Sequence, residues 1–558
     1  QEDAPTSTNG QEDAPTSTGT TMDAPACPAR PAPFCTEPLT EETTPDPANP
    51  IAPGTLVQGT NGPNAGEMTL EHEAWSTPES RFDYTWPSPE DREAAIANGT
   101  FVDYNINIAG IKGYNGRWFM TTPRWKGGVP ATVVEYLPKG SDVEGASPDK
   151  DLFKPWPSWH WNRYSDGTPE DCNSTIQYTH AALVDIKGRL WVIDNGAADL
   201  FVDTGRYVCP PKVMAFDIAE CDANPDTCEP VVHYVLPQEC ARFGGTNTPV
   251  TGGGPIQFLN DLAVDPVTDW IYITDANFPT PPNDGLPGSE YTGGVIGLNV
   301  ELGICNRVSS METDIVQEAP TGSQFIVNGA NIALSQSADG IALDPISDDV
   351  VFTSIGAYST WTMPAAALRD PTLTNDERAA AISRVMVKDD QTDGFTVDPQ
   401  GNLWMGGMQS SSVRKYVRDE WGYFDPNPEI VFSDCSLGVW FDSFGDDIGG
   451  NKIVSASNEI TLFFCELFPG AGIPCPPAPD RTFAFRIFSA PITGGTSMDT
   501  IMAKADTWTE GWPDYAALAA GEDGIGLASD TTSGSSTHTS FKILAFTGML
   551  ALIFMHLH

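Results

Sequence analysis

The sequence predicts an all-β protein: a six-bladed β-propeller with a disordered N-terminal stalk and a C-terminal hydrophobic tail. One hairpin motif recurs, its strands are β-branched and apolar, and its turns carry Asn, Asp and Gly, which suit tight hairpins. Five copies occupy Asp185–Gly196, Asn260–Ala276, Ala338–Ala357, Asp393–Gly407 and Phe441–Ser457, and a looser copy occupies Phe101–Trp125. A hairpin that returns at intervals of about 50–80 residues is typical of a propeller, and six copies predict six blades.

The segments between the copies supply the outer strands of the blades. We expect four of them at Lys212–Ile218, Gly294–Asn299, Ser383–Val387 and Arg481–Ile487. The last should pair with an early strand near Met68–Trp75, because joining strands from the two ends closes the ring and removes exposed edges.

The two ends of the chain differ in composition from this middle part. Residues 1–55 are rich in Pro and Thr and open with a tandem decapeptide, QEDAPTSTNG and QEDAPTSTGT. Such a segment cannot bury a core, which predicts a disordered stalk ahead of a propeller at 65–510. A polar spacer at 511–540 and an apolar segment at 541–558 follow the pattern of a glycosylphosphatidylinositol (GPI) attachment signal. The expected attachment residues are Ser529, Asp530 and Ser533; a short, retained C-terminal anchor is the alternative.

Charge and cysteine content limit the classes of partner. The 558 residues include 29 basic and 75 acidic ones, for a formal net charge of −46. This surface repels nucleic acid and anionic membranes and favours cations, although solubility in a salty medium would also explain it. Eleven cysteines and two glycosylation sequons, at Asn98 and Asn173, predict a secreted or cell-surface protein. Membrane contact is expected only through the lipid anchor.

Polar residues at the starts of the inner strands form the candidate site. In a propeller these positions meet at one mouth of the central channel, so Asn260, Asp261, Asp339 and Asp393 should converge from three blades. Their oxygens could hold Ca²⁺ or a ligand amine. Alternatively, these side chains cap the hairpins by bonding to nearby backbone amides.

A longer stretch of sequence resembles a known family. Between Trp118 and Ile218 the chain reads RWKGGVPATVVEYL, LFKPWPSWHWNRY, DCNSTIQ, GRLWVIDNG and CPPKVMAFDI in that order. This resembles the major royal jelly protein/yellow family, and ADGIALDPISDDVVFTSIGAYSTW resembles its closing blades, so the similarity covers roughly residues 65–510. The resemblance implies a secreted, often glycosylated six-bladed propeller with a ligand site in its channel. It also implies a disulfide between Cys172 and Cys209.

The other cysteines can be assigned only by spacing. Short separations predict local pairs at Cys221–Cys228, Cys465–Cys475 and Cys27–Cys35. The partners of Cys240, Cys305 and Cys435 stay open.

Motifs for catalysis are missing from the sequence. It contains no HExxH, GxSxG, P-loop or CxxC motif. This favours a non-catalytic propeller that binds a small or cationic ligand, a protein partner or a second copy of itself. Two alternatives remain: a yellow-type dopachrome-converting or metal-dependent lactonase-like enzyme, and a structural or adhesive extracellular component. Fold alone does not decide between them.

Overall fold

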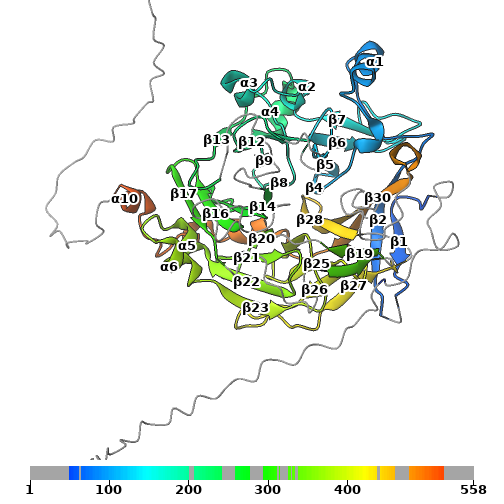
Figure 1. Ribbon diagram of the computed structural model, residues 1–558. Helices are drawn as coiled ribbons and strands as arrows, with labels where there is room; N and C mark the ends of the chain where they lie inside the picture. Colours follow the sequence, from blue (N-terminus) through cyan, green and yellow to red (C-terminus); the bar gives the residue numbers. More distant parts are fainter. Residues whose placement is uncertain are drawn as a thin grey trace, which may run out of the picture.

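The computed structural model describes residues 35, 50–61, 64–199, 206–241, 258–276, 293–310, 313, 324–327, 330–333, 337–435, 440–458 and 477–520. Within these residues the protein is mostly β-structure, and its sheets are arranged around a common centre (Figure 1). Five strands surround that centre: β4, β8, β14, β20 and β28 (Figure 1). This arrangement gives the molecule a propeller-like form.

Four of the sheets have four antiparallel strands each. They are formed by β8 (Ala182–Val184), β9 (Arg189–Asp194), β12 (Lys212–Asp217) and β13 (Val232–Val235); by β14 (Leu259–Val264), β15 (Ile271–Asp275), β16 (Gly294–Asn299) and β17 (Ile304–Val308); by β20 (Ala338–Leu343), β21 (Asp349–Ser354), β22 (Ser359–Pro364) and β23 (Ser383–Val387); and by β24 (Phe395–Val397), β25 (Leu403–Gly407), β26 (Ser412–Tyr416) and β27 (Glu429–Ser433).

The fifth sheet has ten strands and combines both ends of the described chain. Its order is β1 (Thr55–Gln58), β2 (Glu67–Ser76), β30 (Phe483–Pro491), β29 (Lys452–Asn458), β28 (Trp440–Ile448), β4 (Gly110–Tyr114), β5 (Arg117–Thr121), β6 (Val133–Leu137), β7 (Leu152–Pro155) and β3 (Asp83–Tyr84). The antiparallel runs β2–β30–β29–β28 and β4–β5–β6–β7 are joined only by a short parallel pairing of β28 with β4. Two small sheets complete the β-structure: β10 (Ala197–Ala198) with β11 (Arg206–Tyr207), and β18 (Gln324–Val327) with β19 (Ala330–Ala333).

All six expected hairpins are confirmed as antiparallel pairs: β4–β5, β8–β9, β14–β15, β20–β21, β24–β25 and β28–β29. Their turns show why the sequence forms them. Asn115 and Gly116 both have positive φ, 51° and 77°, as a two-residue turn that matches strand twist requires. In the β24–β25 turn, Asp398 Oδ1 accepts from the backbone N–H groups of Gln400 and Asn402, so the carboxylate closes the turn.

The expected closure of the ring is also confirmed. Strand β30 pairs with β2 over Thr69–Ser76, which joins the two ends of the described chain in one sheet. The other three outer strands expected from the sequence correspond to β12, β16 and β23.

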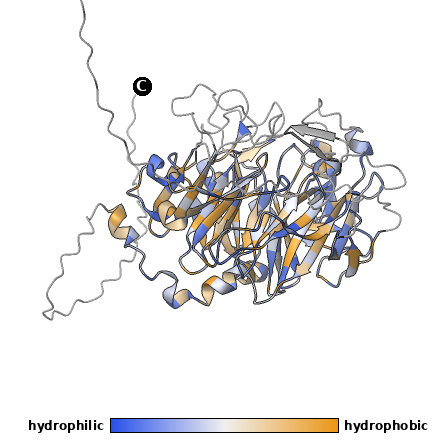
Figure 2. Cartoon of the chain, turned by 90° about the horizontal axis from the view of Figure 1, so that it is seen from below, coloured by the Kyte–Doolittle hydropathy of each residue, from blue (hydrophilic) through white to orange (hydrophobic). Residues whose placement is uncertain are grey.

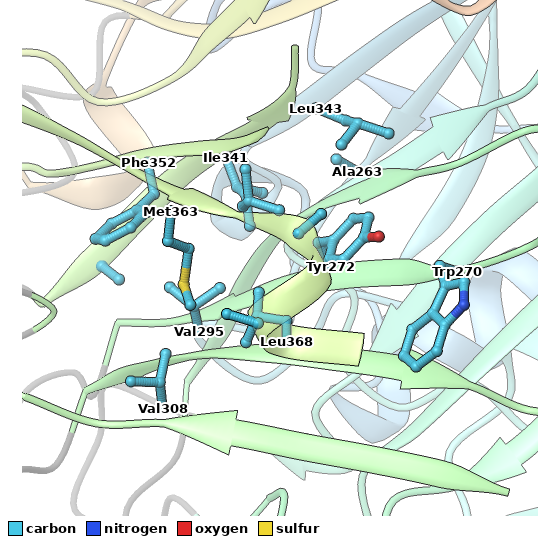
Figure 3. Packing of buried hydrophobic residues seen from close by; sticks show 14 of the residues in the cluster. Ala263, Trp270, Tyr272, Val295, Val308, Ile341, Leu343, Phe352, Met363 and Leu368 are labelled. Atoms are coloured by element: carbon cyan, nitrogen blue, oxygen red, sulfur yellow. The ribbon is translucent and has the colours of Figure 1, made fainter. Parts of the chain in front are cut away.

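The core lies between neighbouring sheets rather than inside one closed barrel. Figure 3 shows Tyr272 and Val295 of one sheet against Ile341, Phe352 and Met363 of the next. Hydrophobic residues are concentrated in the strands, and hydrophilic ones lie mainly in the connections around them (Figure 2). Both faces of each sheet are therefore buried, which explains the continuous apolar strands.

Helices are few and lie outside the sheets. They are α1 (Pro89–Asn98), α2 (Trp159–Asn162), α3 (Pro169–Asn173), α4 (Ile218–Ala223), α5 (Ala365–Arg369), α6 (Asn375–Ala379), α8 (Ser497–Met502), α9 (Ala505–Trp508) and α10 (Tyr515–Ala519). Trp508 and Tyr515 are buried in the core of Figure 3. The packed chain thus extends to Ala519, whereas the sequence had suggested a polar spacer from residue 511.

The disulfides correct one expectation. Cys35 is bonded to Cys435, 400 residues away, so the predicted local Cys27–Cys35 pair is wrong. This bond ties the N-terminal segment to the end of β27, with the Cys35 N–H donating to the Gln409 carbonyl at 2.5 Å. Cys240 is bonded to Cys305, whose pairing the sequence had left open. In the residues that the structure describes, no helix is both long and apolar enough to cross a bilayer.

Candidate ligand site in the central channel

The inner strands line a cavity on the central axis. Its walls are Lys112 of β4, Leu183 and Val184 of β8, residues 261–264 of β14, 341–343 of β20, 395–397 of β24, and Gly445 and Asp446 of β28. The cavity has a volume of about 50 Å³. This is room for a few water molecules or a small group, since one water needs roughly 10–15 Å³.

One end of this channel is closed by α8. Ser497, Met498 and Ile501 line the cavity, and Met498 and Ile501 are buried there. The helix is fixed to the sheets by Lys504, whose Nζ donates to the Pro345 carbonyl at 2.7 Å, and by Trp508, whose Nε1 donates to Asp265 Oδ2 at 3.0 Å. The starts of the inner strands lie at the other end of the channel.

Hydrogen bonds connect the starts of neighbouring inner strands at this end of the channel. Thr121, the pairing partner of Gly110 in β4, donates to the His180 carbonyl just before β8 at 2.5 Å. Asn195, at the end of β9, exchanges two hydrogen bonds with the backbone of Leu259 in β14. We call this end the channel mouth.

Of the four residues expected to converge, Asn260, Asp339 and Asp393 lie together, whereas Asp261 lines the cavity with Lys112. Asn260 Nδ2 donates to Asp339 Oδ2 at 2.7 Å, and the carboxyl group of Asp339 donates to that of Asp393. The close approach requires glycine next to Asp339, because a Cβ at Gly340 would lie 2.9 Å from the Asp393 carbonyl oxygen. These polar groups bond to one another as well as to the backbone.

The two carboxyl groups share a proton. Burial raises the pKa of Asp339 well above its usual range, and the negative charge of Asp393 raises it further. Burial also raises the pKa of Asp393, to about 7, although the hydrogen bond from Asp339 opposes that shift. Burial thus favours the protonated form of both groups, and a proton held between them relieves the repulsion of two adjacent carboxylates.

A second layer lies deeper in the channel, around Lys112. Burial raises the pKa of Asp261, and it raises the pKa of Asp446 to about 7; the charge of Lys112 lowers both. Burial in turn lowers the pKa of Lys112, whose Nζ donates to the Phe444 carbonyl. Asp446 Oδ1 accepts no hydrogen bond from the described residues. Lys112 and Lys388 act on these carboxyl groups as cations, and the raised pKa values mean that protons also reduce the negative charge of the channel.

Aromatic rings also lie at the channel mouth, since His180 and Phe258 come just before β8 and β14. The His180 ring lies 4.9 Å from that of Phe258 and 5.8 Å from that of Trp125. Burial lowers the pKa of His180 to about 3, so the ring is neutral, and its buried Nδ1 has no partner among the described residues. Asp194 holds the backbone that precedes His180 by accepting hydrogen bonds from the N–H groups of Gln177 and Tyr178.

Sequence reasoning missed Lys112, Asp446 and His180 as parts of this site. Lys112 alternates with apolar residues in GIKGY and resembles an outward-facing strand position. Asp446 lies in the acidic, glycine-rich run DSFGDDIGG, which is typical of a polar turn, and His180 has no second histidine at ligand spacing. Their position in the repeat could have identified them, because Lys112 lies in the inner strand of one hairpin and His180 just before the inner strand of another.

The geometry does not favour Ca²⁺ at these carboxyl groups. No three His, Cys, Asp or Glu side chains in the described part of the chain are placed to share a metal ion. Calcium takes six to eight oxygen ligands, whereas Asp339 and Asp393 already use each other and Asn260.

The remaining predicted residues are distributed over the surface and the ends of the chain. Asn98 and Asn173 are exposed at the ends of α1 and α3. Cys172 is bonded to Cys209, and Cys221 to Cys228. Ser529, Asp530, Ser533 and the Cys465–Cys475 pair lie outside the described residues.

Comparisons of the sequence with known proteins found a matching family model and related sequences. Residues 179–276 match the family model described as "Major royal jelly protein". The chain is 27% identical over 372 residues to Protein yellow of Drosophila subobscura, covering 62% of this chain and 57% of that protein. It is 27% identical over 306 residues to Protein yellow of Drosophila melanogaster, covering 53% and 48%. The chain thus spans about half the length of the curated relatives it matches.

Solved structures give more distant matches. A luciferin-regenerating enzyme matches with a TM-score of 0.34 and 13% identity, over 72% of this chain and 95% of that one. A gluconolactonase of Xanthomonas campestris matches with a TM-score of 0.36 and 13% identity, over 78% and 98%.

Proposed function

We propose that this chain, which belongs to the major royal jelly protein/yellow family, binds a small organic amine at the channel mouth and does not transform it. The observation that carries the proposal is the buried Asp339–Asp393 pair, to which Asn260 also donates. An ammonium group would donate to the two carboxyl groups, and its hydrophobic part would lie against His180 and Phe258.

The binding test compares charged and uncharged versions of one ligand shape. Isothermal titration with tyramine, tryptamine and phenethylamine should give saturable binding by at least one amine, whereas phenethyl alcohol, the neutral match of phenethylamine, should bind far more weakly. Asp393→Asn and Asp339→Asn should each weaken binding by about 10-fold or more, since a hydrogen bond to a charged group contributes roughly 1.5–3 kcal/mol. Asp166→Asn, at an exposed loop, is the control. Equal binding of the amine and the alcohol would contradict the proposal.

The same measurement tests a bound metal. If Ca²⁺ occupies the carboxyl pair, a chelator should lower the melting temperature and added Ca²⁺ should restore it. An unchanged melting curve, together with amine binding in the chelator, supports the amine.

A second function, an enzyme, is favoured by one observation. A carboxyl group with a pKa near 7 is well suited to general acid–base work at neutral pH, and Asp393 meets that condition. If the chain is a yellow-type or lactonase-like enzyme, it should accelerate dopachrome decay or lactone opening, and Asp393→Asn should abolish the acceleration. Rates equal to those of the buffer and of the variant leave the binding function.

We also propose that the propeller has six blades. The ten-stranded sheet would count as two, since its two antiparallel halves are joined only by a short parallel pairing. Each of the six units would then contain one of the repeated hairpins.

Secretion is part of the proposal as well. Four disulfides and two exposed sequon asparagines support an oxidising, glycosylating compartment. We propose glycans at Asn98 and Asn173 and a GPI anchor near residues 529–533. Mass spectrometry of the protein from its own cells, with and without phospholipase treatment, checks these modifications.

A further inference from the structure

We propose that a cleft at the rim of the molecule is a second ligand site, for a neutral, hydroxyl-rich ligand such as a sugar. The cleft lies between β2 and the loop that joins β6 to β7, and residues 50–53 form another part of its wall. Its volume is about 460 Å³, within the range of roughly 300–1,000 Å³ typical of small-molecule sites. This cleft is separate from the central channel. The proposal for the cleft does not depend on the amine binding proposed for the channel.

Two of the charged groups in the cleft are held in place by the protein itself. Glu73 accepts from Arg486 Nε and from the Ile51 backbone N–H, both at 2.7 Å, which uses both carboxylate oxygens. The Lys150 ammonium donates to Asp83 Oδ2 at 2.6 Å. These pairs form the frame of the cleft and leave recognition to the other polar groups.

The groups left for a ligand include both donors and acceptors. Asp151 accepts from the Tyr136 hydroxyl and the Lys139 backbone N–H through Oδ1, which leaves Oδ2 as an acceptor. The His72 ring lies edge-on to Tyr136, with centroids 5.8 Å apart, and burial lowers its pKa. A neutral imidazole presents one donor and one acceptor. Asp149 and Lys139 stand exposed at the outer edge.

This mixture of charges selects against ionic ligands. Asp149, Asp151 and Glu79 disfavour an anion, as does the net charge of −46. Lys139 and Lys150 disfavour a simple cation. A sugar hydroxyl both donates and accepts, so adjacent hydroxyls can bind a carboxylate and an imidazole at once. Trp75 also lines the cleft, with the Arg486 guanidinium 5.4 Å from its ring centroid, so the part of the ring that Arg486 does not cover is the aromatic surface available to a sugar.

The experiment is titration of the full chain with maltose, cellobiose and N,N′-diacetylchitobiose, followed by calorimetry and by saturation-transfer NMR. We expect saturable binding of at least one disaccharide. His72→Gln and Asp151→Asn should each weaken it at least fivefold, whereas Asp339→Asn in the channel and His160→Gln on exposed α2 should leave it unchanged. Melting curves establish that each variant is folded. Retention on amylose, cellulose or chitin distinguishes a polymer ligand from a free sugar.

Three results would overturn the assignment. They are no saturable binding of any of these sugars, loss of sugar binding in Asp339→Asn but not in His72→Gln, and displacement of the sugar by tyramine or acetate. The first removes the ligand class, the second moves the site to the channel, and the third shows that the cleft selects for charge.

Discussion

The central channel and the rim cleft both contain carboxyl and lysine side chains. The two regions differ in how the charges of these side chains are balanced. In the channel, Asp261, Asp339, Asp393 and Asp446 are gathered with few cations, and burial raises the pKa of each. In the cleft, Glu73 and Lys150 are matched by Arg486 and Asp83 at hydrogen-bond distance. In the channel the charge of the carboxyl groups is thus reduced mainly by protons, whereas in the cleft Glu73 and Lys150 are paired with oppositely charged side chains.

This difference separates what each region can recognise. A buried excess of carboxyl groups is stabilised by protons or by an added cation, so the channel is selective for positive charge and sensitive to pH. A compensated cleft offers hydrogen bonds without a strong field, so it suits neutral ligands. The two regions also differ in access, since α8 closes one end of the channel.

The largest expected effect concerns that closure. Ile501 is 1% exposed and lines the cavity, so Ile501→Ala should lower the free energy of unfolding by about 3 kcal/mol, through lost burial and a larger cavity. Ile346→Ala, at a 43% exposed position of the neighbouring β20–β21 turn, is the control and should change it by less than about 0.5 kcal/mol. Urea unfolding measures both. A similar loss in the two variants would mean that α8 does not seal the channel.

The next effect concerns the cation of the channel. Lys112→Met leaves Asp261 and Asp446 without the charge that lowers their pKa. We expect a loss of about 2 kcal/mol at pH 8, where the carboxyl groups must ionise, and little loss at pH 5, where they stay protonated. Lys139→Met in the cleft, where the side chain is exposed, should be neutral at both values. Equal losses at pH 5 and pH 8 would point to packing rather than charge.

Much of the fold follows from local sequence signals. The hairpins were predictable because their turn residues and apolar strands lie within about 20 residues of one another. The pairing of β30 with β2 followed from a topological requirement, since a ring without closure exposes edges. The Cys35–Cys435 bond gave no such signal, because its two residues are 400 positions apart. The short helices α8–α10 were missed because each is at most six residues long.

The site was predictable only at the channel mouth. Asn260, Asp339 and Asp393 open the inner strands, and the repeat itself places those positions together. Lys112 and Asp446 come from the looser first copy and from the last one, where the register of the repeat is harder to read. The proton shared by Asp339 and Asp393 depends on burial and on the close approach at Gly340, which composition does not reveal.

The smallest effect tests the shared proton directly. Because burial raises the pKa of Asp393 to about 7 in the folded state, the folded protein holds more protons than the unfolded chain between about pH 4 and pH 7. Stability from this group is therefore fully present below the unfolded pKa of about 3.9 and is lost progressively as the pH rises through 7. Asp393→Asn should flatten this part of the curve and make the variant the more stable protein at pH 8. Asp149→Asn in the cleft should leave the curve unchanged, because that carboxylate is exposed. Thermal unfolding at pH 5 and pH 8 decides the matter: parallel curves for the wild type and Asp393→Asn would remove the contrast between a charged channel and a compensated rim.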